Sequence, residues 1–239
     1  MFEEAPPLRS GEVHVWRVSL DAPLLPVSEL WAVLSDDEWR RAMCLRAQRD
    51  RERFVARRGL LRLVLDGYVR VGPERLRFVQ GRHGKPALTG AGAAFSFNVS
   101  HSDSRALFAV ACGGRVGIDV EVVRDDVDYE RIAARFFSGR ERAELMALPP
   151  PCRRLAFFHG WVRKEAYLKA RGEGLTSPLE RFSVSLSPHE AVRLVETTPD
   201  AQEPTAWSLR GIDPGSDQQG RGHVAALAVE AAGFRLRIF

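Results

Sequence analysis

The order of predicted elements repeats once along this chain, and this repeat is the strongest constraint on its fold. Each part begins with a strand pattern, at 13–18 and at 116–123, followed by a helix start, a long helix pattern and further strand patterns. A double glycine at 113–114 separates the two parts. The sequence therefore predicts an α+β fold made of two similar α/β halves, residues 1–113 and 114–239.

The helix signals are equally clear in both halves. Capping boxes at Ser35 and Ser138, each with a glutamate three residues later, predict helix starts. Long helices are predicted over 49–71 and 153–170. The later strand patterns cover 95–100, 107–112, 182–186, 207–212 and 223–229.

Composition narrows the class of protein. The chain has 239 residues, of which 45% are hydrophobic, so it can build a full core. Its net charge of +4 comes from many charges of both signs, which favours acidic partners without indicating nucleic acid. Its apolar runs are too short for a transmembrane helix, and Cys44, Cys112 and Cys152 form no Cys-x-x-Cys pair. We therefore expect a cytoplasmic protein with no membrane partner.

Two acidic residues alternate on the strand that opens the second half. In the strand pattern at 116–123, Asp119 and Glu121 are two residues apart and therefore project from the same face. One interpretation is an exposed face on which both carboxylates contact water. The other is a partly buried pair that requires a cation between its carboxylates. Because Mg²⁺ prefers oxygen ligands, the second interpretation predicts a magnesium site.

A third carboxylate lies among lysines on the long helix of the second half. Glu165 is one turn from both Trp161 and Lys169, and Lys164 is adjacent to it. The group fits a solvated helix face, or a site in which the carboxylate binds a metal ion and the lysines bind phosphate. Trp161 favours the second interpretation, because tryptophan is rarely part of a fully solvated stripe. Together with the acidic pair, this pattern predicts magnesium and a polyphosphate ligand.

The first half supplies further candidate anion ligands. His101, between two serines at a strand end, fits either a backbone hydrogen bond in a turn or a hydrogen bond to phosphate. Lys85 follows a glycine and precedes Pro86, and the same two alternatives apply to it. The arginines of the helix at 49–71 fit a solvated basic face or a site for a terminal phosphate monoester. These arginines are Arg53, Arg57, Arg58 and Arg62.

Five segments resemble the 4′-phosphopantetheinyl transferase family, in its longer type with two similar halves. They are Gly84-Lys85-Pro86, Asn98-Val99-Ser100-His101-Ser102, Gly117-Ile118-Asp119-Val120-Glu121, Arg135-Phe136-Phe137-Ser138 with Glu141, and Trp161-x-x-Lys164-Glu165-Ala166-x-x-Lys169. Each segment is weak alone, but their order is specific and the resemblance spans most of the chain. It implies two halves related by pseudo-two-fold symmetry, with the active site in the cleft between them.

The resemblance also implies the reaction. A family member transfers the 4′-phosphopantetheine group of coenzyme A to a serine hydroxyl of an acyl or peptidyl carrier protein and releases adenosine 3′,5′-bisphosphate. Mg²⁺ is the expected cofactor. The expected partners are carrier domains of polyketide, fatty-acid or non-ribosomal peptide synthetases. We expect the enzyme to act as a monomer without nucleic acid.

Residue by residue, the resemblance assigns Asp119, Glu121 and Glu165 to the metal ion, with Glu165 or a metal-bound water taking the serine proton. It assigns Lys164 and Lys169 to the phosphate oxygens during bond cleavage.

The coenzyme contacts come from the first half. The resemblance assigns His101 to the pyrophosphate or the 3′-phosphate, with Ser100 beside it. Lys85 and Pro86 are assigned to the adenine and ribose region. Arg62, with Arg57 as the second choice, is assigned to the 3′-phosphate.

Two other classes of function share parts of this pattern. A magnesium-dependent nuclease or phosphohydrolase also uses clustered carboxylates and lysines, but it needs neither Trp161 nor the segment at 84–86. A nucleic-acid-binding module would use the arginine helix, which offers only Phe54 and Tyr68 for base stacking. Coenzyme A binding separates the transferase from both alternatives.

Overall fold

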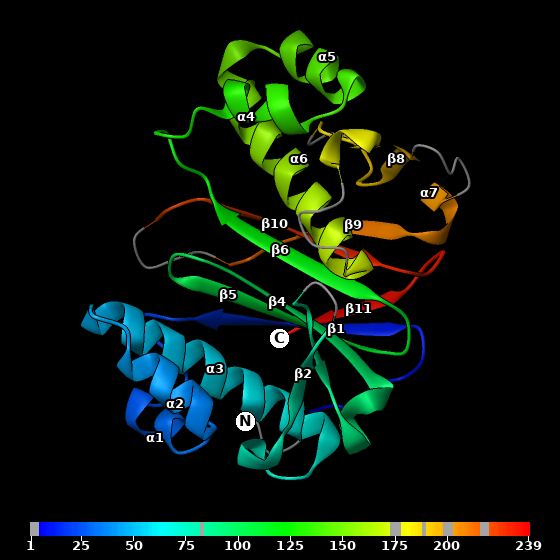
Figure 1. The fold of residues 1–239 in the computed structure, drawn as a ribbon. Helices are drawn as coiled ribbons and strands as arrows, with labels where there is room; N and C mark the ends of the chain where they lie inside the picture. Colours follow the sequence, from blue (N-terminus) through cyan, green and yellow to red (C-terminus); the bar gives the residue numbers. More distant parts are fainter. Residues whose placement is uncertain (1–4, 82–83, 173–177, 188–189, 198–202, 216–219) are drawn as a thin grey trace.

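Two layers of helices enclose two β-sheets in the computed structural model (Figure 1). The structure describes residues 5–81, 84–172, 178–187, 190–197, 203–215 and 220–239. The helices are α1 (Val27–Trp31), α2 (Asp36–Met43), α3 (Gln48–Val69), α4 (Tyr129–Phe136), α5 (Gly139–Ala147), α6 (Pro150–Arg171) and α7 (Glu203–Ala206). The strands are β1 (Glu12–Ser19), β2 (Phe78–Gln80), β3 (Pro86–Leu88), β4 (Phe95–Ser102), β5 (Arg105–Cys112), β6 (Val116–Val122), β7 (Phe182–Val184), β8 (Leu194–Thr197), β9 (Ser208–Ile212), β10 (His223–Val229) and β11 (Arg235–Ile238). The fold is α+β, as predicted.

The order of elements in 12–112 recurs in 116–229. Each stretch has a strand, three helices, a short hairpin and two further strands, and the second stretch adds the short helix α7 after its hairpin. The strand order β1-β5-β4 in one sheet corresponds to β6-β10-β9 in the other. Both predicted capping boxes are formed, at Ser35 and Ser138, and α3 and α6 each have 22 residues. The prediction of strong helices and strands in a repeated order is therefore confirmed.

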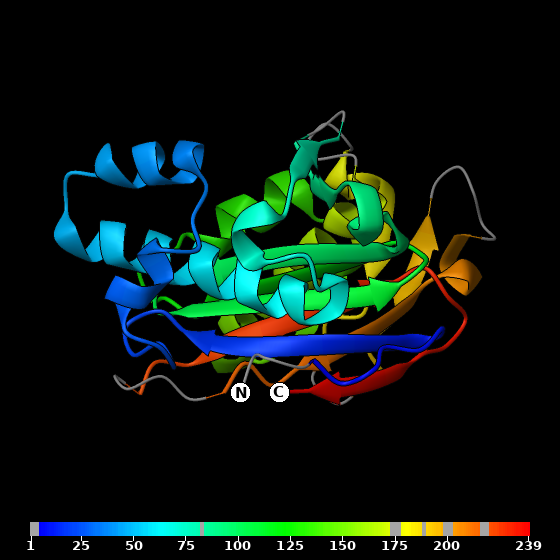
Figure 2. The same cartoon turned by 90° about the horizontal axis from the view of Figure 1, so that it is seen from below.

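The last strand crosses between the two parts of the chain. β11 pairs in parallel with β1, so the first sheet has the order β11-β1-β5-β4 (Figure 2). The Phe239 amide also donates to the Val15 carbonyl at 2.9 Å. The sequence pattern did not predict this strand, and its pairing ties the end of the chain to the sheet of the first half.

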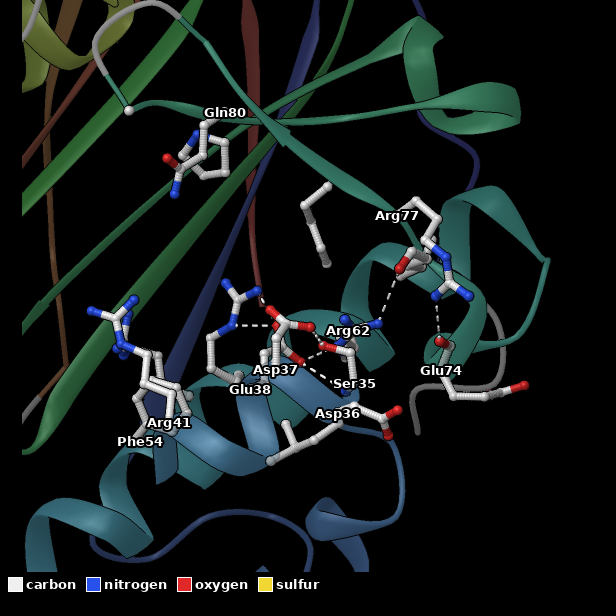
Figure 3. Close-up of a pocket in the computed structure, with 17 residues that line it drawn as sticks. Ser35, Asp36, Asp37, Glu38, Arg41, Phe54, Arg62, Glu74, Arg77 and Gln80 are labelled. Atoms are coloured by element: carbon white, nitrogen blue, oxygen red, sulfur yellow. Dashed lines mark hydrogen bonds and ion pairs between the residues drawn. The ribbon is translucent and has the colours of Figure 1, made fainter. Parts of the chain in front are cut away.

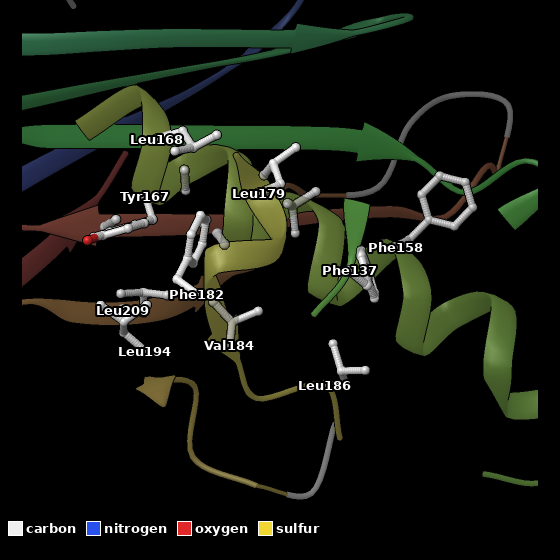
Figure 4. Packing of buried hydrophobic residues seen from close by; sticks show 14 of the residues in the cluster. Phe137, Phe158, Tyr167, Leu168, Leu179, Phe182, Val184, Leu186, Leu194 and Leu209 are labelled. Atoms are coloured by element: carbon white, nitrogen blue, oxygen red, sulfur yellow. The ribbon is translucent and has the colours of Figure 1, made fainter. Parts of the chain in front are cut away.

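Three apolar clusters hold the layers together. One lies between α3 and the first sheet, one between the two sheets, and one between α6 and the second sheet. In the third cluster, Tyr167 of α6 is fully buried and its ring lies 4.9 Å from that of Phe182 (Figure 4). The burial of this α6 face leaves Glu165 and Lys169 on the partly exposed flank of the helix. Among the described residues, no helix combines the length and apolar character needed to cross a membrane.

α6 crosses β6 at Gly117 with direct backbone contact. A Cβ atom at this glycine would lie 2.1 Å from the Ala166 carbonyl oxygen and 2.3 Å from the Ala170 amide nitrogen. Both obstacles are main-chain atoms of a buried helix, so they cannot turn aside as a flexible side chain does. Glycine at this position therefore sets the spacing between α6 and β6, the two elements that carry the predicted metal ligands.

We predict that Gly117→Ala destabilises the protein by about 3 kcal/mol, because the methyl group forces α6 away from β6. Urea unfolding measures the change. Gly139→Ala is the control, because its Cβ would approach only the end of the Arg142 side chain, at 4.0 Å. Equal unfolding midpoints for the two variants would contradict this account of the crossing.

Candidate functional site

Side chains of β4 hydrogen-bond the backbone of β6 where the two sheets meet. β4 and β6 are edge strands of different sheets. Alternate β4 residues point toward β6, as the strand period of two requires. The bonds run from the Ile118 amide to Asn98 Oδ1 (2.9 Å), from the Val120 amide to Ser100 Oγ (3.3 Å) and from the Val122 amide to Ser102 Oγ (3.1 Å). We call these three bonds the β4–β6 ladder.

The middle of the ladder carries a cluster of charged and polar groups. Ser100 Oγ donates to Asp119 Oδ1 at 2.8 Å, and Lys169 Nζ donates to the same oxygen at 2.6 Å and to Ser100 Oγ at 3.0 Å. Asp119 is only 3% exposed, and its Oδ2 has no partner among the described residues. Burial raises the pKa of Asp119 although Lys169 and Ser100 act in the opposite direction.

Two further carboxylates face the same place. Glu165 lies one helical turn before Lys169, and its Oε1 is buried without a partner among the described residues. Burial and repulsion from Asp119 raise the pKa of Glu165 to about 7. Glu121 accepts a hydrogen bond from Ser102 Oγ at 2.8 Å, and burial raises its pKa too. The site thus concentrates negative charge that the protein itself only partly compensates.

This donor set suits a hard divalent cation. Two buried carboxylate oxygens without partners, on Asp119 and Glu165, are the ligand type that Mg²⁺ prefers. No three His, Cys, Asp or Glu side chains in the described part of the chain form a ready metal cage, and the Lys169 ammonium lies beside Asp119. Magnesium sites commonly combine one or two carboxylates with phosphate oxygens of a ligand, so an incomplete protein cage is compatible with such a site.

A pocket of about 780 Å³ lies in the first half between α2, α3 and the β2–β3 hairpin (Figure 3). Five arginines and four carboxylates line it, and we call it the basic pocket. Arg41, Arg57, Gly84 and Pro86 are among its lining residues. The Arg57 guanidinium packs 5.6 Å from the centre of the Phe54 ring but has no ion pair among the described residues. Burial lowers the pKa of Arg57 to about 10, and neighbouring arginines add to the effect. Arg57 remains a cation at neutral pH, so the pocket suits an anion.

The Arg62 side chain is buried and held by several hydrogen bonds. Its side chain is 2% exposed, and its Nε donates to Glu38 Oε2 at 2.6 Å. Its NH1 group donates to the carbonyls of Pro73 (2.7 Å) and Leu76 (3.2 Å). Arg62 is among the residues that line the pocket, but these bonds hold its Nε and NH1 groups. Arg57 has no ion pair among the described residues, so of the two predicted arginines it is the better placed for a 3′-phosphate.

The Lys164 side chain is also buried and held by hydrogen bonds. Its side chain is 0% exposed, and Nζ donates to Glu141 Oε1 (2.8 Å), Glu141 Oε2 (2.7 Å) and the Phe182 carbonyl (2.6 Å). The ammonium therefore faces the core of the second half, whereas Glu165 and Lys169 face the ladder. The structure therefore does not bring Lys164 to the ladder, because the helix period directs it away from both residues.

The remaining predicted residues are Pro86, Lys85 and His101. Pro86 lines the pocket, but Lys85 Nζ donates to the carbonyls of Val116 (2.8 Å) and Ala170 (3.1 Å), and burial lowers the pKa of Lys85 to about 8. Lys85 therefore ties the hairpin to the crossing of α6 and β6. His101 is exposed, yet partial desolvation, together with the charges of Arg57 and other cations, lowers its pKa to about 4. It is neutral at pH 7.

Sequence reasoning missed three contributors to this site. Asn98 and Ser102 complete the ladder, and Arg41 lines the pocket. The sequence contained a signal for Asn98 and Ser102, because polar residues at 98, 100 and 102 alternate on a strand whose other positions are mainly apolar. A strand with such a polar face next to a predicted acidic strand indicates a polar junction between them.

We predict that Asn98→Ala destabilises the protein by about 2 kcal/mol, because the buried Ile118 amide loses its acceptor. Thermal and urea unfolding measure this change. Ser96→Ala is the control, because Ser96 lies on the same face of β4 one step before the ladder. An Asn98→Ala variant as stable as the control would show that the ladder does not hold the sheets together.

Comparison with known proteins gives a consistent picture. Residues 115–228 match the model of the family described as the 4′-phosphopantetheinyl transferase superfamily. The chain is 40% identical over 230 residues to 4′-phosphopantetheinyl transferase HetI of Nostoc sp. (strain PCC 7120), covering 95% of this chain and 92% of that protein. It is 33% identical over 156 residues to 4′-phosphopantetheinyl transferase Sfp of Bacillus subtilis (strain 168), covering 65% and 67% of the two chains.

The solved structures that match include that of holo-[acyl-carrier-protein] synthase from Thermotoga maritima. The match covers 52% of this chain and 64% of that chain, with 25% identity and a TM-score of 0.36. A score at this level has no bearing on the arrangement of the two sheets.

Proposed function

The chain belongs to the 4′-phosphopantetheinyl transferase superfamily, and on that premise we propose how its own residues carry out the transfer. The enzyme transfers the phosphopantetheine group of coenzyme A to a carrier protein. Coenzyme A has two separate anionic parts, the pyrophosphate and the 3′-phosphate. The site offers two matching features, a charged centre on the ladder and a basic pocket beside it. This correspondence is the observation that supports the mechanism most strongly.

The basic pocket binds the adenosine 3′-phosphate end of coenzyme A. Arg57 has its guanidinium in the pocket without an ion pair among the described residues, and Arg41 lines the same space. A guanidinium binds a phosphate monoester through two parallel charge-assisted hydrogen bonds. Pro86 contributes an apolar surface for the base and ribose. Neutral His101 donates one N–H to the nearby phosphate oxygens without adding charge.

The centre on the ladder binds the pyrophosphate. Asp119, Glu121 and Glu165 would hold Mg²⁺, which would supply positive charge against the pyrophosphate. Lys169 donates to a phosphate oxygen from its position beside Asp119, and Ser100 fixes the orientation of both side chains. Phosphoryl transfer leaves the protein mainly positioning and charge stabilisation to supply, and these residues supply both.

The bond change follows from this placement. The carrier serine Oγ attacks the phosphorus that bears the pantetheine arm, and the bond from this phosphorus to the bridging oxygen breaks. The Glu165 carboxylate, through the oxygen that does not hold the metal ion, accepts the serine proton. The electron pair of the broken bond leaves with adenosine 3′,5′-bisphosphate. The product is a serine phosphodiester on the carrier protein.

The catalytic unit comprises two halves, residues 1–113 and 114–239, related by a pseudo-two-fold axis with the active site in the cleft between them. The repeated element order and the matching strand orders support this proposal. The ladder supports it further, since β4 and β6 come from different halves and both carry site residues.

The partners follow from the chemistry of the reaction. Acyl or peptidyl carrier domains of polyketide, fatty-acid or non-ribosomal peptide synthetases supply the serine. The net charge of +4 favours encounter with acidic carrier domains. We place the enzyme in the cytoplasm as a monomer, and its free thiols at Cys44, Cys112 and Cys152 fit a reducing compartment.

Intact-protein mass spectrometry tests the proposed reaction. An apo carrier protein is incubated with the enzyme, coenzyme A and Mg²⁺, with a parallel sample in EDTA. We expect the carrier to gain one phosphopantetheine group only where Mg²⁺ is present. No gain across acyl and peptidyl carriers, together with no coenzyme A binding by calorimetry, would favour a magnesium-dependent phosphohydrolase instead.

We predict that Asp119→Asn lowers kcat about 100-fold or more, because the amide removes the negative charge that a metal ion needs at the centre of the site. The transfer assay at saturating Mg²⁺ measures it, and circular dichroism checks the fold. Glu230→Gln is the matched control, because Glu230 pairs with Arg115 on the exposed surface. Turnover of Asp119→Asn within about twofold of the wild type would rule out this metal site.

The pocket assignment makes a separate prediction. Arg57→Ala should raise KM for coenzyme A about 10- to 100-fold, the value of a charge-assisted hydrogen bond to phosphate. The same variant should use 3′-dephospho-coenzyme A as well as the wild type does, because that substrate lacks the group that Arg57 contacts. Arg49→Ala is the control, since Arg49 pairs with Asp21 on the surface. Equal losses with both substrates would place the 3′-phosphate elsewhere.

A further inference from the structure

We propose that two buried ion pairs, one in each half, fix the rotation of the two long helices and thereby position the active-site side chains. The pairs are Glu141–Lys164 in the second half and Glu38–Arg62 in the first. The inference rests on the proposed function, because it assigns positioning roles in that reaction. The first pair lies in the core and holds the residues of the chemical step. The second pair, in which Glu38 also accepts from Arg58, lies in the wall of the coenzyme pocket and holds the residues of coenzyme binding.

The Glu141–Lys164 pair is fully enclosed and fully bonded. Both side chains are 0% exposed, and Lys164 uses all three of its donors, on the two Glu141 oxygens and the Phe182 carbonyl. Glu141 also accepts from the amides of Ser138 and Val184, both at 2.8 Å. A buried charge bonded on every side has one low-energy position. The Lys164 side chain therefore fixes the rotation of α6 about its axis.

The consequence for the site follows from sequence adjacency. Glu165 is the next residue of α6, so its direction is set about 100° around the helix from Lys164. Lys169 lies one turn after Glu165 on the same flank and reaches Asp119 at 2.6 Å. A small rotation of α6 would move both groups relative to Asp119. Errors of about 1 Å in such a site can cost about 100-fold in rate.

The first half contains the same device at the same place. Arg62 and Lys164 occupy equivalent steps of the two 22-residue helices, α3 and α6. Their carboxylate partners each close a capping box at the start of the preceding helix. Each cation also donates to the carbonyl of the residue that directly follows a short 3-10 helix, Leu76 in one half and Phe182 in the other.

The two pairs should affect different steps of the reaction, because the two long helices carry different site residues. α6 carries Glu165 and Lys169, whereas α3 carries Arg57, which lies in the coenzyme pocket. Loss of the Glu141–Lys164 pair should therefore disturb the chemical step. Loss of the Glu38–Arg62 pair should disturb coenzyme binding more than the chemical step. If the two pairs only stabilised the fold, their loss would not affect the chemical step in one case and coenzyme binding in the other.

The test removes both charges of a pair, because a buried pair replaced as a unit is often tolerated, whereas a single buried charge is not. We expect Glu141→Gln/Lys164→Met to lower kcat about tenfold or more while KM and the calorimetric Kd for coenzyme A change less than about threefold. The single variant Lys164→Arg has the cation type of the first half and keeps the charge pair with Glu141. It should retain most of the wild-type kcat. Glu38→Gln/Arg62→Met should show the opposite division, with a larger rise in KM than fall in kcat.

Each result decides the question. Wild-type kcat in the Glu141→Gln/Lys164→Met variant, or equal falls in kcat in both double variants, would overturn the inference. If this double variant does not fold, Glu141→Asp decides, because it keeps both charges but shortens the connection; we expect the same loss of kcat, and an unchanged kcat would overturn the inference. Absence of transfer by the wild-type enzyme would instead overturn the proposed function.

Discussion

The hydrogen bonds from β4 side chains to the β6 backbone are the interaction on which the rest of the site depends. Asn98, Ser100 and Ser102 satisfy amides of an edge strand that lies in a different sheet, so the two sheets meet through side chains. The serines also donate to the carboxylates of Asp119 and Glu121. One set of bonds therefore joins the sheets and orients the acids.

The cost of this arrangement is concentrated at the centre of the ladder. Asp119 and Glu165 have buried oxygens without partners in the described structure, and burial raises the pKa of both. Repulsion from Asp119 adds to this effect at Glu165. A fold selected only for stability would not keep such a group. Glu141–Lys164, and Glu38 with Arg62 and Arg58, are the contrasting case, in which each buried carboxylate is paired with a cation.

Much of the fold could be predicted from the sequence because its signals are local. The capping boxes at Ser35 and Ser138, the long helices and the alternating strands depend on neighbouring residues, and the structure contains all of them. The pairing of β11 with β1 depends on residues more than 200 positions apart, and a four-residue strand has no local pattern strong enough to reveal it. Short elements such as β2 and β3 were missed for the same reason.

The candidate site divides in a similar way. Spacing correctly grouped Glu165 with Lys169, which are about 40° apart around a helix. Lys164 and Lys169 are about 140° apart, as are Arg57 and Arg62, so one member of each pair had to face the core. Which member did so depended on the buried partners Glu141 and Glu38, and these contacts are set by tertiary packing. The resemblance assigned roles from the residue type at each position. It did not distinguish a residue that contacts the ligand from one held in a buried ion pair.

In the proposed mechanism, coenzyme A lies across the junction of the two sheets, with its pyrophosphate at the ladder and its 3′-phosphate in the basic pocket. A crystal structure with coenzyme A and Mn²⁺, located by anomalous scattering, tests this most directly. We expect the manganese peak beside Asp119, Glu121 and Glu165, and the 3′-phosphate within hydrogen-bond distance of the Arg57 guanidinium. A coenzyme bound away from the ladder, or a metal peak remote from these carboxylates, would contradict the account.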